Sequence, residues 1–133
     1  MKKQFLTLLL ITIVSTAFAQ KEVKISTVDF IQILNNNKKE VLFYYQNNWE
    51  ELRKKAVKKS YIDSYQLLET TPTKDAPFSF MLITTYKNKA QFDKREAHFQ
   101  ELIKAQGKLK LLNNKKPKEF RKTIFGKDVY HRE

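Results

Sequence analysis

The sequence contains no cysteine, only two glycines and only three prolines in its 133 residues. The lack of cysteine excludes disulfide bonds, a cysteine nucleophile and the attachment of a lipid through a cysteine. The scarcity of glycine and proline argues against linkers, repeats and low-complexity segments. No glycine-rich phosphate loop, His-Glu-x-x-His motif or Gly-x-Ser-x-Gly motif is present, so no motif identifies a reaction.

The first 19 residues have the features of a signal peptide. The basic start Met1-Lys2-Lys3 is followed by an apolar run from Phe5 to Val14, and Ala17-Phe18-Ala19 supplies the small residues that signal peptidase reads. The apolar run is shorter than the roughly 20 residues of a membrane-spanning helix, although a retained anchor is the alternative. We therefore expect cleavage before Gln20, export to the periplasm or beyond, and a single mature domain over residues 20–133 without a transmembrane segment.

Basic residues outnumber acidic residues by 26 to 14, which gives a formal net charge of +12. An exported protein is not expected to meet nucleic acid. The charge could attract the protein to anionic envelope surfaces such as lipid headgroups, or it could simply solvate the exterior. The lysines are spread along the chain rather than gathered in one block, which favours the solvated exterior.

The hydrophobic pattern predicts strands and helices in a defined order. The predicted elements are a strand over 27–34, a helix over 38–59, strands over 60–70 and 78–87, a helix from an Asn88 cap to Gln106, a helical turn over 118–123 and a short last strand over 126–132. An alternative makes Val41–Tyr45 a strand and begins a helix at Asn48. We favour one continuous helix, because an apolar stripe continues in register from Val41 to Ala56.

This order is the split β-α-β pattern of a ferredoxin-like α+β domain with an antiparallel sheet. Such a domain carries its helices on one face of the sheet. The strand over 78–87 nevertheless has apolar side chains on both faces, with Phe80 and Leu82 on one face and Met81 and Ile83 on the other. A second copy of the chain would cover the free face, so the pattern predicts a homodimer packed sheet to sheet, with a barrel between the subunits.

Three segments resemble the dimeric α+β-barrel superfamily: FIQILNNNKKEVLFYYQNNWEEL, YIDSYQLLE and FMLITTYKNKAQFDKREAHFQELI. This superfamily includes antibiotic-biosynthesis monooxygenases, haem-degrading monooxygenases, and NIPSNAP-like and EthD-like proteins. The resemblance covers Phe30 to Ile103. It implies a cavity between the sheet and the helices of each subunit, and it does not imply one chemistry.

Arg95 is the main candidate for a ligand-binding residue. The predicted helix places it on the apolar stripe with Phe92 and Phe99, where a charge must be paired or must face a wet cavity. It could bind the carboxylate or phosphate of a ligand in a cleft between sheet and helices. The alternative is a structural pair with a carboxylate such as Glu51, Asp63 or Glu96, or an arginine that extends outward over the apolar face.

Four further residues are candidates for the same cleft. His98 could ligate haem or a metal or act as a base, although a lone histidine is more often a surface residue. Tyr86 ends the central strand next to the cap of the helix that carries Arg95. Tyr45 and Trp49 lie on the first predicted helix, and their rings could orient a ligand or belong to the core or dimer interface.

Three functions therefore stay open, with no metal site among them. The first is a cofactor-free binding protein or degenerate enzyme that takes a small apolar or anionic molecule in the cleft. The second is a haem-binding or cofactor-independent monooxygenase-like enzyme that uses His98, Tyr86 and Arg95. The third is an envelope protein whose lysine-rich exterior meets anionic surfaces.

Overall fold

The computed structural model describes residues 21–132, and the predicted signal peptide lies outside these residues. The strands are β1 (Ile25–Ile33), β2 (Ser64–Glu69), β3 (Phe80–Tyr86) and β4 (Arg121–Tyr130). The helices are α1 (Lys38–Tyr44), the π-helical η1 (Tyr45–Trp49), α2 (Glu50–Lys58), α3 (Lys89–Asp93), α4 (Arg95–Gln106) and α5 (Pro117–Phe120). The strands form one antiparallel sheet in the order β2-β3-β1-β4. The predicted ferredoxin-like α+β fold is therefore confirmed.

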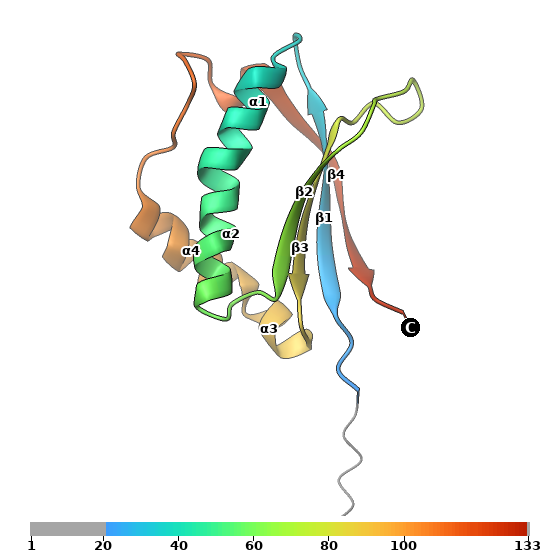
Figure 1. The fold of residues 1–133 in the computed structure, drawn as a ribbon, viewed down its shortest axis with the longest axis vertical. Coiled ribbons are helices and arrows are strands. Elements are labelled where there is room, and N and C mark those ends of the chain that lie inside the picture. Colours follow the sequence, from blue (N-terminus) through green and yellow to red (C-terminus); the bar gives the residue numbers. More distant parts are fainter. Residues whose placement is uncertain (1–20, 133) are drawn as a thin grey trace, which may run out of the picture.

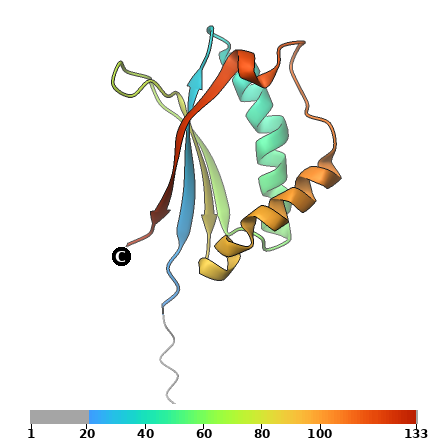
Figure 2. The ribbon, with the colours of Figure 1, turned by 180° about the vertical axis from the view of Figure 1, so that it is seen from behind.

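The long helices α2 and α4 cover one face of the sheet, and no described helix covers the other face (Figures 1 and 2). The helix-facing side chains of β1 and β3 include Ile31, Phe80 and Leu82, which form a core with Val41 and Tyr45. These apolar side chains alternate with others that point away from the helices, as the period of two in a strand requires. The burial of this core ties the sheet to the helices.

A continuous helix over residues 38–58 follows β1, so the alternative strand at Val41–Tyr45 is wrong. The middle of this helix is the five-residue π-helix η1, a form that is frequent at functional sites. Asn48 lies in η1, and its side-chain amide donates a hydrogen bond of 2.8 Å to the Tyr44 carbonyl oxygen. The wider turn leaves both Tyr45 and Trp49 buried on the side that faces the sheet.

The helix predicted from Asn88 to Gln106 is broken at Lys94 into α3 and α4. Asn88 is the expected cap, because its side chain accepts a 2.8 Å hydrogen bond from the Gln91 backbone amide. The Gln91 side chain also donates to the Ser60 carbonyl oxygen and accepts from the Lys87 amide, each over 2.8 Å, which ties α3 to the turn after α2 and to the end of β3. Gly107 ends α4 with a φ of 78°, as predicted.

The last strand is much longer than predicted. The helical turn expected over residues 118–123 ends at Phe120, and the ten-residue β4 follows at once and pairs along the whole of β1. β4 is an edge strand and most of its side chains are exposed, so it lacks the apolar pattern that marks a buried strand. The other strands agree with the prediction to within a few residues at their ends.

The sheet face opposite the helices, here called the open face, carries a cluster of apolar side chains. Met81 and Ile83 of β3 point to it, as predicted from the two-sided apolar pattern, and Val28 and Phe30 of β1 pair with them. The Phe30 ring lies 4.5 Å from the Phe125 ring of β4, between ring centroids. Among residues 21–132, no helix has the length and apolarity needed to cross a membrane.

Candidate functional site

Two adjoining pockets lie between the sheet and the helices, and we call them together the helix–sheet cleft. Asp29 and Ile103 line both pockets. The charged pocket has a volume of about 430 Å³, and the aromatic pocket has a volume of about 290 Å³. The charged pocket is lined by Thr27, Asp29, Arg53, Tyr86, Arg95, Glu96, Phe99, Ile103, Gly126, Lys127 and Asp128. Side chains that lie in the aromatic pocket include Tyr44, Tyr45, Asn48, Trp49, Leu52, Leu82, Gln106, Leu109 and Arg121.

Arg53 is the central cation of the charged pocket. Its guanidinium carbon lies 4.6 Å from the Trp49 ring centroid and 4.2 Å from the Phe99 ring centroid, and its Nε donates a hydrogen bond of 3.2 Å to the Thr84 hydroxyl. Burial lowers the pKa of Arg53 to about 10, while Tyr86 and Asp29 oppose this effect. Arg53 therefore stays protonated at neutral pH. None of the ion pairs formed among the described residues includes it.

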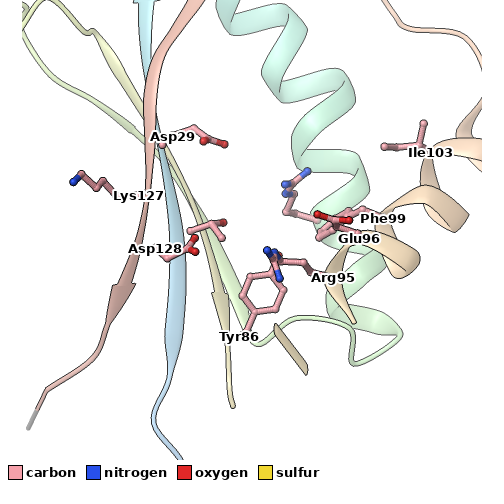
Figure 3. Close-up of a pocket in the computed structure, with 11 residues that line it drawn as sticks. Asp29, Tyr86, Arg95, Glu96, Phe99, Ile103, Lys127 and Asp128 are labelled. Atoms are coloured by element: carbon pink, nitrogen blue, oxygen red, sulfur yellow. The ribbon is translucent and has the colours of Figure 1, made fainter. Parts of the chain in front are cut away.

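Arg95 and Tyr86 meet in the same pocket (Figure 3). Arg95 donates a hydrogen bond of 3.1 Å to the Phe92 carbonyl oxygen and lies 3.9 Å from the centroid of that residue's ring. It takes part in no carboxylate pair within the described chain, so the alternative of a structural pair with Glu51, Asp63 or Glu96 is wrong. Burial raises the pKa of the Tyr86 hydroxyl, so this group is a hydrogen-bond donor at neutral pH.

Asp29 faces these cations from β1. Figure 3 shows Asp29 and Asp128 extending from the sheet toward the helices, while Lys127 extends away from them. Burial raises the pKa of the Asp29 carboxyl, and Asp128 adds to this rise while Arg53 opposes it. The residue paired with Asp29 on β4 is Gly126. A Cβ atom at position 126 would lie 2.7 Å from Asp29 Oδ1, so the absent side chain makes room for the carboxylate.

The aromatic pocket combines rings with unpartnered polar atoms. Tyr45 is buried, and burial raises the pKa of its hydroxyl. Arg121 donates from Nη2 to the Tyr44 hydroxyl over 3.4 Å, whereas its Nε is buried and has no hydrogen-bond partner among residues 21–132. Gln106 Oε1 is also buried and accepts no hydrogen bond from the described part of the chain. An orphan donor and an orphan acceptor in one apolar pocket are a feature expected where a polar ligand group or a water binds.

His98 lies apart from the other candidate residues. Its ring stacks on Tyr61 with 3.6 Å between centroids and 6° between planes, and it lines neither pocket of the cleft. The expectation that His98 shares a cleft with Tyr86 and Arg95 is therefore wrong. His131 lies 2.7 Å from the Ser26 hydroxyl, through its Nε2. The described residues thus offer no imidazole to a haem iron in the cleft, and they contain no cluster of three or more histidine and carboxylate side chains that could hold a metal.

Among the cleft residues that sequence reasoning missed are Arg53, Asp29 and Gly126. Arg53 follows Trp49 by four positions, so the two share a helix face, and that spacing was a usable signal. Asp29 alternates with Ile31 on the helix-facing side of β1, where a carboxylate is unusual. Gly126 carries no local signal, because its role depends on a side chain of another strand.

Comparison with known proteins finds no matching family model and no similar curated protein. Solved structures with a similar fold include HapK from Hahella chejuensis, at 11% identity and a TM-score of 0.49 over 79% of this chain and 90% of that one. A conserved protein from Methanosarcina mazei Go1 gives 16% identity and a TM-score of 0.44 over 84% of this chain and 94% of that one. An antibiotic biosynthesis monooxygenase-like protein from Nitrosomonas europaea gives 14% identity and a TM-score of 0.43 over 84% of this chain and 90% of that one. These likenesses are too distant to assign a superfamily or a function, so membership of the dimeric α+β-barrel superfamily stays a prediction.

Proposed function

We propose that this protein binds a small amphipathic anion, such as an aryl carboxylate, in the helix–sheet cleft. The observation that carries this proposal is Arg53, a largely buried guanidinium between two aromatic rings with no ion-pair partner among the described residues. An unpaired charge at such a site costs stability, and a bound carboxylate would compensate it. Arg95 and the Tyr86 hydroxyl lie in the same pocket and supply further donors.

The aromatic pocket suits the apolar part of such a ligand. It adjoins the charged pocket through Asp29 and Ile103, and the Trp49 ring lines it while also contacting Arg53. Pockets of a few hundred cubic ångströms, lined by rings and a few convergent polar groups, are typical of small-molecule sites. A ligand with a ring at one end and an anion at the other would therefore span both pockets. The proposal requires no cofactor.

The fluorescence of Trp49 provides the test, because Trp49 is the only tryptophan of the chain and lines the cleft. We would titrate the protein with phenylbutyrate, with its neutral counterpart phenylbutanol and with its cationic counterpart phenylbutylamine. The expected result is saturable quenching by the carboxylate, with an affinity about tenfold or more above that of the alcohol and no binding of the amine.

Arg53→Met should abolish this preference, because methionine fills the space between the rings but carries no charge. The matched control is Arg132→Met, which removes an exposed arginine outside both pockets and should leave the titration unchanged. Equal affinity for the acid and the alcohol, or an Arg53→Met variant that still prefers the acid, would overturn the proposal.

We further propose that the mature protein is exported and forms a homodimer through the open face. Support comes from the apolar side chains that this face leaves half exposed, among them Phe30, Ile83 and Phe125. A patch of this kind on a soluble protein marks an interaction surface. A second copy presents the same apolar surface, so its open face is chemically matched to this one.

A further inference from the structure

Asp29 lies where the two pockets of the cleft meet, and it lines both of them. It is held on β1, a central strand paired on both sides, and not on a loop. Its carboxylate accepts no hydrogen bond and joins no ion pair within the described residues, although Arg53 is close enough to lower its pKa. The carboxylate oxygens are thus free to accept a proton from a molecule in the cleft.

The sheet is shaped to accommodate this carboxylate. Gly126 stands opposite Asp29 and leaves the space for Oδ1, and the β1–β4 register shifts between Phe30 and Ile31, next to Asp29. β-Bulges of this kind are frequent beside active sites, where they redirect a side chain. Burial raises the pKa of the Asp29 carboxyl, which makes its ionised form a stronger base than a solvent-exposed aspartate.

We propose that Asp29 is a general base that moves a proton at an acidic carbon of the bound carboxylate, as in the keto–enol isomerisation of an aryl α-keto acid. This inference rests on the proposed function, because it uses the same cleft and ligand class. The carboxylate of Asp29 removes a proton from the carbon between the ring and the keto group. The electron pair of that C–H bond forms a C=C bond, and the carbonyl oxygen takes the negative charge.

The cations of the charged pocket complete this chemistry. Arg53 and Arg95, with the protonated Tyr86 hydroxyl, lie where they can stabilise the carboxylate and the developing enolate oxygen. Protonation of that oxygen gives the enol, and return of a proton to the carbon restores the keto form. The cycle moves only protons, so it needs no oxidant, reductant or metal.

The probe is phenylpyruvate, which carries a ring, a carboxylate and an acidic carbon between them. Proton NMR in deuterated buffer measures the loss of its benzylic hydrogens, and Trp49 fluorescence measures its binding in parallel. We expect the wild-type protein to accelerate the exchange about a hundredfold or more over buffer alone, the usual contribution of a positioned general base. Asp29→Asn should return the exchange to the buffer rate while phenylpyruvate still quenches Trp49.

The control is Asp75→Asn, an identical substitution in the exposed loop between β2 and β3, which should exchange like the wild type. Binding of phenylpyruvate without exchange, or exchange that survives in Asp29→Asn, overturns the catalytic role and leaves the binding function intact. No binding of phenylpyruvate or of phenylbutyrate overturns both. A third readout is pH: the wild-type exchange rate should fall as the medium becomes acidic enough to protonate Asp29.

Discussion

Gly126 leaves empty the space into which Asp29 Oδ1 extends, because a Cβ atom at position 126 would lie only 2.7 Å from that oxygen. The two residues face each other across the β1–β4 pair. The backbone of Gly126 does not have the positive φ that favours glycine, so the glycine serves the neighbouring carboxylate and not the strand itself. A substitution at Gly126 can therefore move the Asp29 carboxylate while Asp29 itself stays unchanged, which tests whether its position matters.

Gly126→Ala should displace the Asp29 carboxylate without unfolding the protein. The new methyl group meets the mobile end of a side chain, and alanine is no worse than glycine in a strand, so the free energy of unfolding should change by less than about 1 kcal/mol. Phenylpyruvate exchange should fall about tenfold or more, since small misplacements of a catalytic group cost large factors in rate. Chemical denaturation and the NMR assay measure the two effects. Unchanged exchange would show that the placement of Asp29 is unimportant.

Asp29→Asn should stabilise the protein at neutral pH and not in acid. The folded state raises the pKa of this carboxyl above its ordinary value of 3.8. The protein therefore loses stability as the pH rises from the ordinary pKa through the raised pKa of the folded state, because the carboxyl ionises less readily when it is folded. Asparagine has no such cost. The variant should therefore melt at a higher temperature than the wild type at neutral pH, and the difference should vanish below the ordinary value, where the carboxyl is protonated in both states. A thermal melt at each pH measures this, with Asp75→Asn as the control. A difference that persists in acid would contradict the burial of the charge.

The element order was predictable from the sequence because its signals are local. The apolar stripe of residues 38–58, the Asn88 cap and the Gly107 stop each depend on side chains within a few positions of one another. β4 was not predictable to its full length, because it lies at the sheet edge and its pairing with β1 supplies what its hydrophobic pattern lacks.

The candidate site was predictable only in part for a similar reason. Tyr86 ends β3 and Arg95 begins α4, with only the short α3 between them, so their meeting in one pocket follows from a short connection. Asp29, Arg53 and Gly126 come from β1, α2 and β4, and only the packing of helices on the sheet brings them together. His98 was misplaced because its ring stacks on Tyr61, which lies in the turn after α2, and no local signal indicates a contact between residues so far apart in the chain.

Asn48→Ala should weaken both the fold and the aromatic pocket. Asn48 is 3% exposed, and besides its bond to Tyr44 it donates to the Lys110 carbonyl oxygen and accepts from the Lys110 amide, each over 2.8 Å. These bonds hold the segment after α4, whose Gly107 and Leu109 line the pocket. Loss of a buried amide with these partners should cost about 2–3 kcal/mol.

Asn47→Ala is the matched control, because the Asn47 side chain makes one hydrogen bond within the described residues, which is 2.9 Å long and ends on the Phe43 carbonyl oxygen. It should cost less than about 1 kcal/mol. Urea denaturation followed by Trp49 fluorescence gives both values, and a phenylbutyrate titration shows whether the pocket has loosened. Equal losses of unfolding free energy in the two variants would mean that the two hydrogen bonds between Asn48 and Lys110 contribute nothing to stability.

Phe125→Lys should convert the proposed homodimer into a monomer. Phe125 is 45% exposed on the open face and packs against Phe30, so a lysine there would place two charges in a sheet-to-sheet interface that leaves them unpaired. Sedimentation at micromolar concentration should give a dimer mass for the wild type and a monomer mass for the variant, with identical far-ultraviolet circular dichroism. Val23→Lys is the control: Val23 is also 45% exposed but precedes β1 and lies outside the sheet, so this variant should stay dimeric. A wild-type protein that sediments as a monomer would refute the interface, and the half-exposed ring cluster would then need another partner.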